Sequence, residues 1–314
     1  MKKWIIATLI ILILTIVSIY IFIPGRIVIS KLVTAKVTLD GAVRYLSSEN
    51  NWERWWMDEQ GKTHEKGKPF VFNGAVYRLS TYQNKAVGIE ISDQGSNINS
   101  VISLVSLNKD STLALWQCEI PGSNNPFLKM SGYRQAVAIK ENMNAVIKNF
   151  LRFISKPENI YGFTFRREST NDTLLLSARF NTKHYPTTVD IYQYLSQVEA
   201  NIKKQKATIA GFPLLHIGRP GDGSYEVQVA WPTSKWLKND GIFFSRRMVK
   251  GYFIVADVTG GFGTVSSALD QLENYTNDYG KTRMAIPFQR LVTDRKKQTD
   301  TAKWLTQIYM PVIE

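Results

Sequence analysis

The chain has 314 residues, of which 44% are hydrophobic and 21% are charged, a composition that is typical of globular proteins and excludes a disordered chain. It contains a single cysteine, Cys118, so an intramolecular disulfide framework and a cysteine-based metal cluster are both excluded. The length accommodates two domains and an appendage.

The formal net charge is +13 at pH 7, and the basic residues cluster at 203–206, 246–250 and 295–297. A basic surface serves nucleic acid, an anionic membrane or solubility alone. We find no helix-turn-helix, zinc-finger or RNA-binding signature, so we expect no nucleic-acid partner. Beside a membrane anchor, attraction to anionic lipid is the more economical functional interpretation, and a plain solvated face is the alternative.

Residues 1–25 are predicted to be a transmembrane anchor. Trp4 to Ile23 carries no charge, and its 20 residues span about 30 Å as a helix, the thickness of a hydrocarbon core. Bulky β-branched residues continue to Pro24, where a cleaved signal peptide has small residues, so we expect the anchor to be retained. A short lysine-bearing N-terminus favours an extracytoplasmic location for the soluble part, but basic residues flank both ends, which leaves the orientation open.

Residues 26–157 are predicted to form one α+β domain. Strand-like runs at 27–38, 70–79, 86–91, 99–107 and 112–118 are separated by turn residues. Asp40 is the expected cap of a short helix that ends at Leu46. Apolar residues from Met143 to Ile154 recur at helical spacing and predict a long amphipathic helix. The simplest assembly is a curved antiparallel sheet wrapped on that helix.

The strand, the short helix and the segment Leu46-Ser-Ser-Glu-Asn-Asn-Trp-Glu-Arg-Trp-Trp56, followed by a meander and a long helix, resemble the START-like (SRPBCC) helix-grip superfamily of polyketide cyclases and ligand-binding proteins. The resemblance implies a helix-grip fold. The tryptophans at 52, 55 and 56 would line a cavity mouth or reach toward the membrane interface, and packing of the short helix against the sheet is the alternative.

Residues 160–314 contain an internal repeat. Moved back by 74 positions, Leu269 falls on Leu195 and Ile286-Pro287 falls on Phe212-Pro213; with an offset of 79, Trp304–Pro311 falls on Tyr225–Pro232. A nearly constant offset through helix and strand indicates a duplicated strand-helix-strand-strand unit, with coincidence as the alternative. Two such units related by a pseudo-twofold axis form one domain with a groove, a common place for small ligands.

The second copy is predicted as a strand at 247–257, a Gly-rich turn, a helix at 265–275 and strands at 285–292 and 304–311. Tyr252 to Phe262, that helix, Ile286-Pro287 and residues 300–311 are similar to GyrI-like effector-binding domains, which also occur in transcription regulators. The resemblance implies a two-unit α+β fold with a ligand groove, which in the family often holds an acidic residue that contacts cationic ligands. Because an anchor and a START-like domain precede the unit here, direct transcription control is not expected.

The predicted ligand site combines one carboxylate with aromatic walls, which suit a flat or cationic organic ligand. Strand alternation places Glu226 on the face opposite Val227 and Val229, and the valines suit packing under the helices. Each aromatic residue has core packing as its alternative role. The predicted ligand-binding residues are Glu226, Tyr225, Trp231, Tyr252, Trp304 and Tyr309.

The sequence contains no complete motif for dinucleotide binding, metal binding or nucleophilic catalysis. Gly261-Phe-Gly263 precedes a helix, but Ser266 replaces the third glycine of a dinucleotide loop. The three histidines show no metal-ligand spacing, and Cys118 has no base partner visible in the sequence. We therefore predict no cofactor, no metal, no catalytic residue and no protein partner. The sequence favours a membrane-anchored small-molecule binding protein; the alternatives are a hydrolase of small reactive compounds with a groove carboxylate as base, and a non-binding membrane scaffold.

Overall fold

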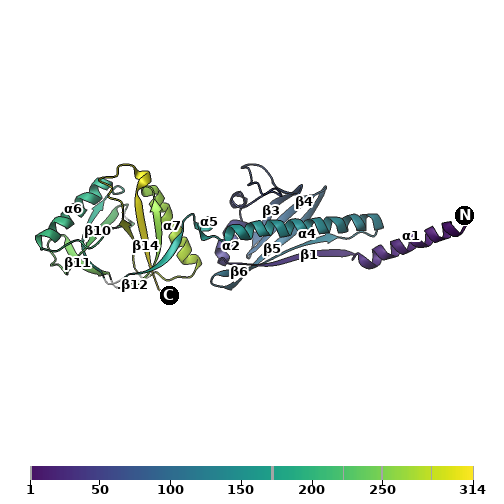
Figure 1. Ribbon diagram of the computed structural model, residues 1–314, viewed down its shortest axis with the longest axis horizontal. Coiled ribbons are helices and arrows are strands. Elements are labelled where there is room, and N and C mark those ends of the chain that lie inside the picture. Colours follow the sequence, from purple (N-terminus) through teal and green to yellow (C-terminus); the bar gives the residue numbers. More distant parts are fainter. Residues whose placement is uncertain (1, 171–172, 222, 249, 284, 314) are drawn as a thin grey trace. The chain divides into compact units, whose positions relative to one another are not determined.

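The computed structural model describes residues 2–170, 173–221, 223–248, 250–283 and 285–313. The chain divides into two units, residues 1–156 and 157–314. Each is an α+β unit built on one antiparallel sheet, of six strands in the first unit and eight in the second, as far as the described residues extend (Figure 1).

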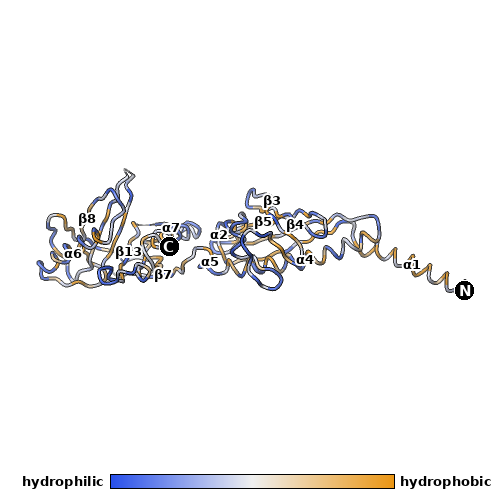
Figure 2. Tube along the Cα trace, turned by 90° about the horizontal axis from the view of Figure 1, so that it is seen from above, coloured by the Kyte–Doolittle hydropathy of each residue, from blue (hydrophilic) through white to orange (hydrophobic). Residues whose placement is uncertain are grey.

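The chain begins with helix α1 (Lys2–Phe22). From Lys3 to Phe22 its mean hydropathy is 2.9, and Figure 2 shows its apolar character. Within the described ranges it is the one helix long and apolar enough to cross a membrane. Pro24 follows at once and cannot donate the next helical hydrogen bond.

The sheet of the first unit has the order β1-β6-β5-β4-β3-β2. The predicted strand at 70–79 is wrong as a single strand, because Asn73 and Gly74 have φ of 47° and 78° and form a two-residue hairpin turn. Asn-Gly is the preferred pair for such a turn. The strands are β1 (Arg26–Ala35), β2 (Phe70–Phe72), β3 (Ala75–Gln83), β4 (Ala86–Asp93), β5 (Ser96–Asn108) and β6 (Ser111–Pro121).

Three helices accompany this sheet: α2 (Leu39–Leu46), α3 (Glu49–Trp52) and the long α4 (Pro126–Ile154). The cap of α2 is Thr38 rather than the predicted Asp40, since the Thr38 hydroxyl accepts a hydrogen bond from the Gly41 N–H at 3.2 Å. Helix α4 contacts β1 and β6 and begins well before the predicted stretch, because Asn125 caps it and Pro126 occupies its first turn.

Indole rings fill the interior of the first unit. Trp52, Trp55 and Trp56 are at most 3% exposed, which favours the packing alternative over a cavity mouth or a membrane contact. Their indole N–H groups donate to the carbonyls of Leu46, Tyr45 and Val71 at 2.8, 3.1 and 3.0 Å. A buried tryptophan whose N–H is paired contributes its full apolar area without leaving a polar group unsatisfied. The START-like assignment of this unit stays a prediction.

The second unit begins with the short helix α5 (Pro157–Tyr161) and has the strand order β11-β8-β10-β9-β13-β14-β12-β7. This order is symmetric about the contact between β9 and β13, with α6 and α7 at matching places in the two halves. The elements are β7 (Phe165–Thr170), β8 (Thr173–Thr182), α6 (Thr188–Lys204), β9 (Leu214–Gly218), β10 (Tyr225–Pro232), β11 (Phe243–Met248), β12 (Gly251–Thr259), α7 (Phe262–Asp278), β13 (Phe288–Leu291), η1 (Thr301–Lys303) and β14 (Leu305–Val312).

Each half has one strand more than the predicted strand-helix-strand-strand unit. The predicted strand at 247–257 is wrong as a single strand, because β11 pairs with β8 whereas β12 pairs with β14 and β7. The two strands therefore lie six positions apart in the sheet although they follow one another in sequence.

Two short connections force this sheet to curl. Two residues separate β7 from β8, and two separate β11 from β12, yet each pair is six positions apart in the sheet. Six positions correspond to roughly 29 Å across a flat sheet. Two residues reach only about 11 Å. The sheet must therefore bend until its two wings approach each other, which creates a concave face.

The single cysteine gives a first test of the packing. Burial raises the pKa of the Cys118 thiol to about 11, and its side chain is 4% exposed against Met143. At pH 8 roughly one thiol in a thousand is then ionised, and the thiolate is the reactive form. We expect no labelling by a thiol-disulfide reagent within minutes in the folded protein and complete labelling in denaturant. Rapid labelling without denaturant would contradict this packing.

The division into units gives a second test. Fragments 26–157 and 160–314 each contain their own sheet and core, so we expect each to melt cooperatively in isolation. Circular dichroism during heating measures this. A fragment 160–314 that is unfolded alone, beside a folded full chain, would show that the proposed boundary is wrong.

Candidate functional site

Helices α6 and α7 cover the same face of the curled sheet. Leu215 packs with α6 and Ile308 packs with α7. Leu215 lies opposite Gln289, and Gln289 lies opposite Ile308. Residues directly opposite on antiparallel strands share a face. The other face of the sheet, which we call the groove, includes Phe288 and Tyr309, which alternate with Gln289 and Ile308.

An aromatic cluster lies in the groove. The rings of Phe288 and Tyr309 are stacked, with centroids 5.0 Å apart and planes 2° apart. Phe253 meets both rings edge-on, at 5.7 and 5.8 Å. Met248 packs against the same cluster. This is a third apolar cluster of the sheet, away from both helices. Phe253 and Tyr309 are buried in it, whereas Phe288 and Met248 are half-buried and keep part of their apolar surface accessible.

Three cavities of about 340, 170 and 140 Å³ adjoin this cluster, and Met248 and Phe288 line all three. The largest extends between Tyr252, Ile286 and Pro311. Its polar lining comes from Arg247 and Lys250, while Arg290 lines the second cavity. Among the described residues that line the three cavities there is no aspartate or glutamate.

Behind the aromatic cluster lies a short relay of hydrogen bonds. The Arg290 guanidinium donates to the Tyr309 hydroxyl at 3.1 Å, and that hydroxyl donates to the Glu168 carboxylate at 3.1 Å. Arg166 donates to the same carboxylate at 2.6 Å. Burial raises the pKa of Tyr309, against the opposing effect of Arg290, so the hydroxyl stays protonated at neutral pH. The Glu168 carboxylate, on β7, therefore contacts the cluster through the Tyr309 hydroxyl.

Glu226 lies on the face of the sheet that alternation indicates, opposite the buried Val227 and Val229. Its carboxylate accepts a hydrogen bond from Arg179 at 3.1 Å, and its side chain is 36% exposed. It lines none of the three groove cavities. A half-exposed paired carboxylate attracts a second cation weakly, because its charge is already balanced and screened.

The six predicted ligand residues do not lie together. Tyr309 and Tyr252 line groove cavities, and Tyr252 is covered by the Arg167 guanidinium at 4.1 Å. Tyr225 and Trp304 lie toward the helices instead, where each joins a chain of ring contacts. This chain runs through Tyr225, Tyr185, Phe262 and Trp304, and Arg295 stacks on its last two rings.

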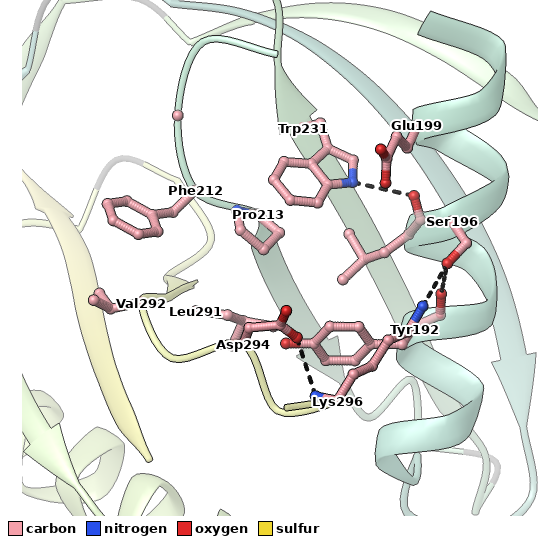
Figure 3. Close-up of a pocket in the computed structure, with 12 residues that line it drawn as sticks. Tyr192, Ser196, Glu199, Phe212, Pro213, Trp231, Leu291, Val292, Asp294 and Lys296 are labelled. Carbon is pink, nitrogen blue, oxygen red and sulfur yellow. Dashed lines mark hydrogen bonds between the residues drawn. The ribbon is translucent and has the colours of Figure 1, made fainter. Parts of the chain in front are cut away.

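Trp231 lines a separate cavity of about 270 Å³ on the helix-covered face, between α6 and the segments before β9 and after β13 (Figure 3). Its indole N–H donates to the Leu195 carbonyl at 3.1 Å. The charged side chains there have protein partners: Glu199 pairs with Lys203 at 2.7 Å, and Lys296 donates to the Ser196 hydroxyl at 2.8 Å.

Sequence reasoning missed most of the groove. Nothing in the sequence distinguishes Phe253, Phe288 and Met248 from other apolar strand residues. They share one face of the sheet only because strands distant in sequence pair with each other. Arg290 and Glu168 carry no motif. The available signal was alternation within β13 and β14, which places Phe288 and Arg290 on one face and Gln289 and Leu291 on the other.

Several solved structures are similar to this chain over about half its length. The crystal structure of the EcmrR C-terminal domain is 15% identical and covers 48% of this chain and 98% of that chain, with a TM-score of 0.43. SAV2435 bound to tetraphenylphosphonium is 15% identical and covers 48% and 94%, with a TM-score of 0.31. A hydrolase from Listeria innocua is 11% identical and covers 48% and 92%, with a TM-score of 0.38. No protein-family model and no curated protein matches the chain. At these identities and TM-scores the similarities assign the chain to no family.

Proposed function

We propose that the second unit binds a small aromatic molecule non-covalently in the groove. The observation that carries this proposal is the set of three adjoining cavities around the stacked rings of Phe288 and Tyr309. A flat ring system inserted beside such a pair gains offset-stacked or edge-on contacts and removes apolar area from water. Concave sites with aromatic walls and few polar groups are typical of small-ligand pockets.

The charges around the groove favour a ligand that carries negative charge. Arg247, Lys250 and Arg290 line the cavities, and no carboxylate does so among the described lining residues. This departs from the cationic ligand that Glu226 suggests in the sequence, because Glu226 is paired with Arg179 and lines no groove cavity. Guanidinium groups bind carboxylate and sulfonate oxygens through directed N–H donors.

The two family resemblances belong to the same proposal. The strand order that is symmetric about β9 and β13 supports a GyrI-like duplicated unit, and the order strand, short helices, meander and long helix supports a START-like first unit. The hydrolase alternative has one contact in its favour, the Glu168 carboxylate against the Tyr309 hydroxyl. That carboxylate already accepts from Arg166 as well, which favours a structural and binding role.

Binding tests the groove directly. With residues 26–314, we expect the aromatic sulfonate 1-anilinonaphthalene-8-sulfonate to bind more tightly than the aromatic cation tetraphenylphosphonium. Phe288→Leu keeps an apolar side chain but removes the stacked ring, and we expect it to weaken sulfonate binding about tenfold, equal to about 1.4 kcal/mol. Isothermal titration calorimetry measures both affinities.

Binding by matched variants distinguishes the groove from the cavity of Figure 3 and from Glu226. Trp236→Ala removes a tryptophan that is 57% exposed and lines none of the cavities described above, so binding should stay within about twofold of the unchanged chain. Loss of binding in Trp231→Ala but not in Phe288→Leu would move the ligand to the cavity of Figure 3. Tighter binding of the cation, weakened by Glu226→Gln, would restore the site expected from the sequence.

We also propose that α1 spans a membrane and is retained, with the soluble part on the extracytoplasmic side. Its exposed apolar side chains from Lys3 to Phe22 would otherwise face water over about 30 Å. We expect the full chain to remain in membranes after carbonate and high-salt extraction, whereas residues 26–314 should be soluble. A shortened soluble form released from cells carrying the full chain would show that the segment is removed.

A further inference from the structure

Two large apolar side chains are exposed on the first turn of α4. Phe127 is 81% exposed and Leu128 is 61% exposed. Neither belongs to the stripe of α4 that packs on the sheet, whose apolar members include Ala136, Ile139 and Met143. The Asn125 side chain accepts from the N–H groups of both residues, at 2.9 and 3.4 Å, which fixes this turn. The backbone of this turn is therefore held in place, and both side chains present apolar surface to solvent.

Strand register places this turn beside the end of α1. Arg26, the first residue of β1, lies opposite Pro121, the last residue of β6. Three residues separate Arg26 from the end of α1, and four separate Pro121 from the start of α4. The two segments run against each other, because a Cβ built on Gly122 would lie 2.0 Å from the carbonyl oxygen of Gly25. The pairing of β1 with β6 therefore places the end of α1 close to the start of α4.

Side-chain contacts join the same two ends. The Tyr20 hydroxyl, near the end of α1, donates to the carbonyl of Asn124, immediately before α4. The Lys129 ammonium lies 4.8 Å from the centroid of the Tyr20 ring. Lys129 is only 8% exposed, so its charge packs on this ring. Tyrosine is enriched where a spanning helix meets the headgroups, and Tyr20 beside the turn of Phe127 and Leu128 is therefore a residue typical of a membrane interface.

We infer that the first turn of α4 docks on the lipid bilayer, with Phe127 and Leu128 inserted at the interface of the membrane that α1 spans. The inference rests on the proposed membrane span of α1. If the hydrocarbon core ends near Phe22, the register of β1 and β6 brings the turn to the headgroup level. Burial of the two apolar side chains in the interface then adds to the hold of α1. The first unit contacts the membrane at two points instead of one.

Depth-dependent quenching tests this inference in the full chain. In a Cys118→Ala background reconstituted into phosphatidylcholine and phosphatidylglycerol vesicles, a nitrobenzoxadiazole label is placed at Phe127→Cys, and quenching by doxyl-labelled lipid is measured. A matched control is Val105→Cys, which is 56% exposed in the first unit and lies toward the end of the sheet away from Pro121. Ile13→Cys, in the middle of α1, reports whether the helix spans the bilayer.

We expect strong quenching at positions 13 and 127 and little at 105, with a blue-shifted emission at 127. Quenching at 13 alone would overturn the docking and leave the anchor standing. A blue shift at 127 without lipid quenching would mean that protein covers the turn, as with a partner or a second copy, and would also overturn the inference. No quenching at 13 would overturn the membrane span itself, and the docking with it.

Discussion

The second unit depends on the covalent constraint that two-residue connections place on its eight-stranded sheet. Because β7 joins β8 and β11 joins β12 across six sheet positions, the sheet has to bend. Bending gives it an outer face, which needs cover, and an inner face, which is sheltered by its own wings. The helices α6 and α7 cover the outer face with two separate apolar clusters. The groove is therefore a direct consequence of chain connectivity.

The two faces of this sheet differ in chemistry as well as in cover. In the cavity of Figure 3, on the helix-covered face, Trp231 packs against α6, and Glu199 and Lys296 have protein partners. In the groove, three aromatic rings and a methionine meet cavities lined by basic side chains. Half-buried apolar side chains such as Phe288 and Met248, next to basic side chains and with no carboxylate among the described lining residues, are the arrangement that suits the proposed aromatic anion.

The first unit buries three tryptophans, at 52, 55 and 56, between its six-stranded sheet and its helices. The indole N–H of each donates to a backbone carbonyl at 2.8 to 3.1 Å. The β1–β6 pairing brings the start of α4 to the end of α1, so the sheet register decides which side chains lie beside the proposed membrane span.

The sequence by itself determined those features that depend on neighbouring residues. The length and apolar character of α1, the amphipathic core of α4 and the alternation that separates Glu226 from Val227 and Val229 all follow from local periodicity. The repeat offset located matching elements in the two halves. Local patterns also contained the Asn73-Gly74 turn, which splits the predicted strand at 70–79.

Only the tertiary structure decided which side chains meet. Tyr225, Trp231 and Trp304 look equivalent to Tyr309 in the sequence, yet they lie toward the helices, whereas Tyr309 stacks on Phe288 in the groove. Alternation assigns a residue to one of two faces, but strand order and curvature decide which face is a core and which is a groove. These depend on pairings such as β12 with β7, which join residues about 85 positions apart. Local periodicity carries no information about such distant pairings, and the candidate site is built from them.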